Sequence, residues 1–136
     1  MKHLLFWLWQ WTWGFPQSLI GFIVFLCSCN CPHETYRGCI VTHWDQRGSL
    51  GVGMFLFLDR HADRDTLIHE YGHSVQSIIL GPLFLPIMGI PSFLWCNLPP
   101  CRRLRREKGV SYYRFYPEST ANRLGTWATG EACGLH

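Results

Sequence analysis

The chain has 136 residues, of which 48% are hydrophobic and only 15% are charged, and its formal net charge is +3. The length predicts one domain, residues 1–136, and the low charged fraction, against about a quarter in ordinary soluble domains, favours contact with membrane lipid. Most of the excess positive charge lies at residues 102–108 beside apolar sequence, which argues for lipid headgroups and against a nucleic-acid-binding surface.

The N-terminal segment 4–27 is apolar and contains no Asp, Glu, Lys, Arg or His. It exceeds the roughly 20 residues that a helix needs to cross a bilayer, but Gly14 and Pro16 interrupt it. The segment is therefore either a kinked span or a Trp-rich interfacial piece followed by a shorter apolar helix. A cleaved signal peptide is the competing interpretation, but no A-x-A-like site follows, so we expect the segment to be retained.

Four of the seven cysteines lie close together, at Cys27, Cys29, Cys31 and Cys39. They could form disulfides or bind a soft metal, although their CxCxC spacing lacks the CxxC form of structural zinc sites. We favour the interpretation that these cysteines are small apolar residues at a membrane boundary. A cysteine-based metal or redox module is the alternative function for them.

Residues 36–58 are rich in β-forming side chains and predict one β-hairpin. Its strands would be 36–44 and 49–58, joined by a four-residue turn at 45–48. The second strand leads toward the next predicted element, a helix over 65–80 for which Asp65 is the natural N-cap.

This helix carries an HExxH motif at residues 69–73. Residues four apart share one helix face, so His69 and His73 can offer two imidazole nitrogens to one Zn²⁺ ion. Glu70 stands at the edge of that face, where a carboxylate can take a proton from a zinc-activated water and pass it to a leaving amine. Gly72 costs a helix interior up to about 1 kcal/mol relative to Ala, so we expect another element to pack close to its backbone.

The following segment, 78–98, is uncharged and contains Pro82, Pro86 and Pro91. Three prolines disfavour an uninterrupted spanning helix and predict a re-entrant or interfacial segment.

The last predicted element is a helix over 117–125, with Pro117 at its first position and Gly125 just past its end. A catalytic zinc needs a third protein ligand. Glu118 is the best candidate, because its neighbours are uncharged and Asn122 follows one turn later on the same face. Two other carboxylates are poorer candidates, Glu107 in the basic cluster and Glu131 in a Gly-rich end.

At this point the chain resembles the gluzincin metallopeptidases, in which a helical HExxH is followed by a ligating Glu and, four residues on, by an Asp that orients a ligating His. The resemblance implies zinc ligation by His69, His73 and Glu118, catalysis by Glu70, and a supporting role for Asn122, where Asn replaces the usual Asp. It also implies that the strand before the motif helix holds an extended peptide. Residues 48–125 further resemble small bacterial membrane proteins with an HEYGH helix and a late Phe-Tyr-x-Glu-x-x-Ala-Asn segment.

These features predict an α+β, membrane-associated and mainly helical fold with one β-hairpin before a zincin-like HExxH helix. The predicted function is a membrane-bound zinc peptidase acting on a peptide or a membrane-adjacent protein. The alternative is a non-catalytic membrane protein with a structural or regulatory metal site. The expected location is the bacterial cytoplasmic membrane, with the metal site on the cytoplasmic side, because the basic cluster marks that face and one zinc ion requires its ligands on one side.

Overall fold

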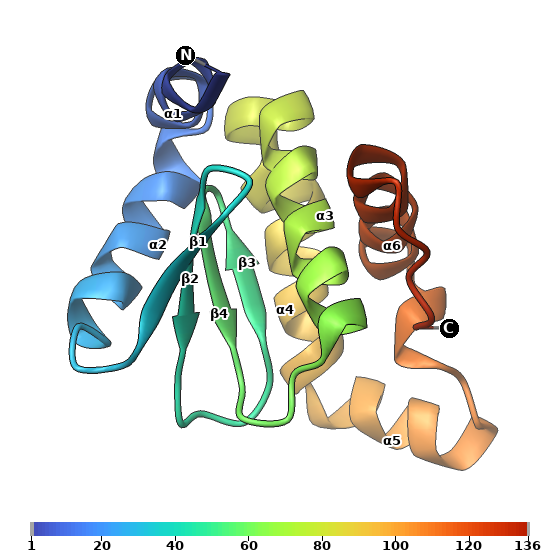
Figure 1. The fold of residues 1–136 in the computed structure, drawn as a ribbon. Coiled ribbons are helices and arrows are strands. Elements are labelled where there is room, and N and C mark those ends of the chain that lie inside the picture. The colour runs from blue at the N-terminus through green and yellow to red at the C-terminus, as the bar shows by residue number, and fades with distance from the viewer. Residues whose placement is uncertain (1, 136) are drawn as a thin grey trace.

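The fold was analysed in a computed structural model that describes residues 2–135. It consists of helices around one small sheet, with the chain passing from two N-terminal helices through the strands to the C-terminal helices (Figure 1). In chain order the elements are α1 (Lys2–Thr12), α2 (Phe15–Cys27), β1 (His33–Tyr36), β2 (Cys39–His43), β3 (Leu50–Val52), β4 (Phe55–Leu58), α3 (Arg64–Leu80), a 3-10 turn η1 (Gly81–Leu83), a π turn η2 (Leu85–Gly89), α4 (Ile90–Asn97), α5 (Pro99–Lys108), a 3-10 turn η3 (Tyr112–Arg114) and α6 (Tyr116–Thr129).

The sheet has four strands in the order β1-β2-β4-β3. Two antiparallel pairs, β1 with β2 and β3 with β4, are joined by a parallel pairing of β2 with β4. A two-residue turn joins the two strands of each antiparallel pair. Arg37 and Gly38 both have positive φ, as in the I′ turns that suit tight hairpins, and Gly53 has positive φ at the first turn position of the other pair. The prediction of one hairpin over 36–58 is therefore wrong.

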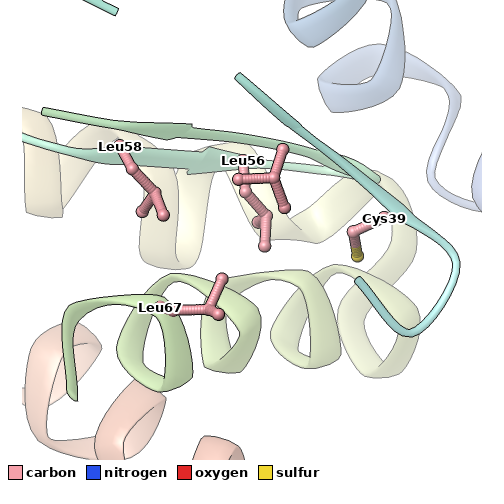
Figure 2. Packing of buried hydrophobic residues seen from close by; sticks show 5 residues of the cluster. Cys39, Leu56, Leu58 and Leu67 are labelled. Atoms are coloured by element: carbon pink, nitrogen blue, oxygen red, sulfur yellow. The ribbon is translucent and has the colours of Figure 1, made fainter. Parts of the chain in front are cut away.

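Both faces of the sheet are covered by helices. On one face, Cys39, Leu56 and Leu58 point toward α3, the helix that carries Leu67, as Figure 2 shows. On the other, Phe55 and Phe57 pack against side chains of α1 and α2. Alternate residues of β4 thus enter two separate cores, which explains why its Phe-Leu-Phe-Leu sequence is apolar throughout.

The N-terminal segment is split into α1, of 11 residues, and α2, of 13 residues, at Trp13 and Gly14. At about 1.5 Å per residue α2 is roughly 20 Å long, short of the roughly 30 Å of a bilayer core. Within residues 2–135, no helix is both long enough and apolar enough to span a membrane. The fold is α+β and mainly helical, but the predicted single hairpin is wrong, because the strands form one four-stranded sheet, and no described helix provides the membrane span that the N-terminal segment suggested.

The first two helices are also bound to α3 by buried polar groups. Gln10 Nε2 donates to Ser74 Oγ at 3.2 Å, and Gln17 Nε2 donates to Ser77 Oγ at 2.7 Å. Other side chains of α1 and α2, such as Leu4 and Ile23, are exposed. Lipid contact and a location at the cytoplasmic membrane stay predictions.

The Pro-rich segment 78–98 is helical through η1, η2 and α4. Its three prolines, Pro82, Pro86 and Pro91, each fall in the first two positions of one of these elements. The backbone nevertheless stays helical without a break from Phe84 to Asn97. Pro91 has no N–H for the carbonyl of Ile87, which instead accepts a hydrogen bond from the Tyr116 hydroxyl at 2.6 Å.

Candidate metal centre

The motif helix α3 begins one residue earlier than predicted. Its N-cap is Asp63, whose Oδ1 accepts a hydrogen bond from Thr66 N at 2.9 Å, and Asp65 lies inside the first turn. The prediction of Asp65 as N-cap is therefore wrong. The cap residue was misjudged because both Asp residues precede the apolar stretch, and sequence alone does not show which of them has an extended backbone.

Helices α3 and α6 touch backbone to backbone at two glycines. A Cβ atom at Gly72 would lie 1.9 Å from the carbonyl oxygen of Ala121, and one at Gly125 would lie 2.2 Å from that of Ile68. Gly125, predicted just past the helix end, is thus inside α6, which continues to Thr129 and ends at Gly130 with φ 73°. The contact brings the motif of α3 against the first turns of α6.

The two histidines of α3 and the glutamate of α6 meet in this contact. His69 Nε2 lies 3.0 Å and His73 Nε2 lies 3.4 Å from the same oxygen, Glu118 Oε2. The three residues are buried, with relative exposures of 3%, 6% and 0%. Among residues 2–135 their cluster includes no fourth His, Cys, Asp or Glu.

In each of the two histidines, a side-chain amide determines which ring nitrogen carries the hydrogen. Asn122 Nδ2 donates to the carbonyl oxygen of Leu135, which leaves Asn122 Oδ1 to accept from His69 Nδ1 at 2.5 Å. In the same way, Gln76 Nε2 donates to the carbonyl oxygen of Pro117, and Gln76 Oε1 accepts from His73 Nδ1 at 2.8 Å. Both histidines therefore carry a proton on Nδ1, so in the neutral rings Nε2 presents a lone pair.

Three electron-pair donors thus converge on one buried point, where a cation between them would offset their mutual repulsion. A proton can bridge only two of the atoms at once, whereas a metal ion can bind all three. Tetrahedral zinc bonds of about 2.1 Å separate the ligand atoms by about 3.4 Å, close to the observed 3.0 and 3.4 Å from Glu118 to the two histidines, and all three ligand atoms lie within 4.8 Å of one another. The donor set and its spacing therefore fit Zn²⁺.

The other oxygen of Glu118 is also held. Ser92 Oγ, from α4, donates a short hydrogen bond to Glu118 Oε1. Burial is the largest influence on the pKa of this carboxyl and raises it, but the facing imidazoles of His69 and His73 together with the Ser92 hydroxyl outweigh burial and hold the pKa well below its usual value. Glu118 is thus an anion suited to binding a metal.

Glu70 lies beside this cluster without joining it. The residue is 5% exposed, and burial is the main cause that raises the pKa of its carboxyl to about 7, with His69 opposing and Glu118 adding to the shift. A Cβ atom at Gly51 of β3 would come within 3.0 Å of Glu70 Oε2, so the edge of the sheet borders this carboxylate. No described residue donates a hydrogen bond to it, which leaves it free to accept one from water.

The remaining candidates from the sequence lie elsewhere. Glu107 pairs with Arg103 and Glu131 with Arg64, both on exposed surfaces. The cysteines are free, and within residues 2–135 the early four do not form a metal-binding group. Cys39 is buried against Ser74 while Cys27 and Cys29 are exposed.

Sequence reasoning missed two supporting residues, Gln76 and Ser92. Gln76 had a usable signal, because it follows His73 by three residues and so lies on the same helix face. Ser92 had none, since it comes from a different helix and its sequence neighbours are apolar.

Comparison of the chain with protein-family models, curated proteins and solved structures gave no match.

We expect Asn122→Ala and Gln76→Ala each to weaken zinc binding by about 10–100-fold, because each removes the acceptor that orients one imidazole. Zinc affinity would be measured by competition with a chromophoric chelator, with Asn97→Ala, an exposed amide on α4, as the control. Equal affinity in wild type and both site variants would show that the amides do not support the metal ligands.

Proposed function

We propose that this chain is a zinc-dependent peptidase in which His69, His73 and Glu118 hold the metal and Glu70 is the general base. One observation carries the proposal. Three buried donor atoms converge on one point, the cluster has no fourth protein ligand within residues 2–135, and a carboxylate without a hydrogen-bond donor lies next to it. Three protein ligands and an open position are the pattern of catalytic rather than structural zinc.

The chemistry divides between the metal and the chain. When bound, Zn²⁺ would act as a Lewis acid that makes a water more acidic and polarises a peptide carbonyl. Glu70 would take the proton of the attacking water and pass it to the nitrogen of the leaving amine. Asn122 and Gln76 would keep the two imidazoles in the tautomer that ligates through Nε2, and Ser92 would restrain Glu118.

The sheet supports a peptide as the substrate. β3 is an edge strand, and no further strand of residues 2–135 pairs with its outer side. Its central residue, Gly51, lies against Glu70 and His73. An extended peptide that pairs with this edge would be held by main-chain hydrogen bonds beside the catalytic carboxylate. The gluzincin resemblance of the HExxH helix and of Glu118 agrees with this assignment.

The proposal is tested with the purified full chain. We expect about one zinc per chain by elemental analysis, and cleavage of a peptide library, followed by mass spectrometry, that stops with a chelator and returns with added zinc. His73→Ala should lose both zinc and cleavage. Stoichiometric zinc without cleavage of any peptide would instead favour the alternative of a structural or regulatory metal site. Zinc retained by His73→Ala would reject the assigned ligands.

A further inference from the structure

A pocket of about 660 Å³ lies on the outer side of the metal centre, between η3, α6 and the C-terminal residues. Two of its wall residues also belong to the site. The ring of Tyr113 packs edge to face on the ring of His69, with 5.2 Å between their centres, and Asn122 accepts the His69 hydrogen bond. The pocket and the metal centre therefore share a wall.

Two arginines, Arg114 and Arg123, line the pocket, and none of its described lining residues is Asp or Glu. Carboxylates do lie behind its wall: in addition to burial, Asp63 raises the pKa of both Tyr113 and Cys133. Both arginines are exposed, and neither guanidinium forms an ion pair or hydrogen bond with another described residue. In contrast, Arg64 and Arg103 elsewhere are neutralised by Glu131 and Glu107. Two guanidiniums that pair with no carboxylate of residues 2–135 thus border one cavity.

The rest of the lining is largely apolar. Trp127, whose side chain is among the most exposed at 77%, lies beside the arginines, and Leu135 closes the cavity on the C-terminal side. A guanidinium recognises a carboxylate through paired N–H donors, while an indole ring and a leucine side chain accommodate the aliphatic stem that carries it. The lining therefore suits a carboxylate on a short apolar arm.

We propose that this pocket binds a carboxylate group of the peptide substrate, through Arg114 and Arg123, and so directs the proposed peptidase toward sequences with an acidic side chain or a free C-terminus near the cleaved bond. This inference rests on the proposed function. It adds a substrate preference that neither the metal ligands nor the edge strand supplies.

The test measures binding to the metal-free full chain, so that no cleavage intervenes. Three N-acetylated peptides of one sequence would be titrated by ligand-observed NMR: one with Glu and a C-terminal amide, one with Gln and a free C-terminus, and one with Gln and an amide. We expect one or both carboxylate-bearing peptides to bind about tenfold more tightly than the neutral one, the value of one good charge-assisted contact. Comparing the first two peptides tells a side-chain carboxylate from a terminal one.

Arg114→Gln and Arg123→Gln should each abolish most of this preference, whereas Arg106→Gln, which changes another exposed arginine, on α5, should leave it unchanged. Circular dichroism would check that the variants are folded. Equal binding of all three peptides, or an equal loss in Arg106→Gln, would overturn the proposal. The failure of this proposal can be told from failure of the peptidase assignment. Zinc-dependent cleavage with no preference for carboxylate-bearing peptides would reject the role of the pocket. Carboxylate binding without zinc-dependent cleavage would reject the peptidase assignment.

Discussion

Replacing Glu70 by Gln is expected to lower peptide cleavage by about 10²–10⁴-fold, the usual contribution of a positioned general base, while the bound zinc stays at its wild-type level. The amide keeps the size and shape of the side chain but cannot accept the proton of the attacking water. Zinc should be retained because Glu70 lies outside the cluster formed by His69, His73 and Glu118. The measurements are kcat/KM on a responsive peptide and zinc by elemental analysis.

The matched control is Glu107→Gln, which makes the same chemical change in an exposed ion pair on α5. We expect its activity to equal that of wild type, because exposed pairs contribute little. Turnover in Glu70→Gln within about twofold of wild type would remove this carboxylate from the mechanism. A parallel loss of zinc would make Glu70 part of the metal site instead.

Gly72→Ala is expected to destabilise the protein by about 1–3 kcal/mol or more, the usual range for overpacking, even though Ala is the better helix former by up to about 1 kcal/mol. The added methyl group would lie 1.9 Å from the carbonyl oxygen of Ala121, and because that atom belongs to the backbone, α6 itself must move. Glu118 moves with α6, so zinc affinity should fall too. Urea unfolding of the metal-free protein and chelator competition measure the two effects separately.

Gly89→Ala provides the control for this substitution. Gly89 also has helical backbone, with φ −65°, but its added Cβ would first meet the flexible end of the Leu85 side chain, at 3.2 Å. We expect Gly89→Ala to leave the stability unchanged or to raise it by up to about 1 kcal/mol, the gain in helix propensity. A stability of Gly72→Ala equal to or above that of wild type would mean that the two helices are not held in backbone contact.

The candidate site could be predicted from the sequence because its chemistry depends on local spacing. His69 and His73 share a face in any α-helix, and Glu118 with Asn122 repeats the same four-residue interval. Even the close approach at Gly72 had a signal, since a glycine in a helix interior needs a reason. What spacing could not supply was the partner of each group across the fold, such as Ser92 on Glu118.

The fold could be predicted less well, because its deciding contacts are non-local. The pairing of β2 with β4 is parallel, and neither strand alone carries a sign of it. The turn at Arg37 and Gly38 lacks the Asn-Gly or Asp-Gly pair that usually marks a tight hairpin. The apolar N-terminal segment suggested a bilayer span, but it folds as two short helices whose Phe6, Trp11, Val24 and Phe25 cover one face of the sheet, while most of their other large apolar side chains are exposed.

Helix α3 has no side turned fully to solvent along its central part. Leu67 meets the sheet, Ser74 and Ser77 meet the N-terminal helices, and Gly72 meets α6, so ten of the residues from 67 to 77 are buried. Natural selection for packing and for catalysis would therefore act on the same short stretch. Invariance along it among related chains would not by itself distinguish a reacting group from a structural one, whereas isosteric exchanges such as Glu70→Gln separate the two.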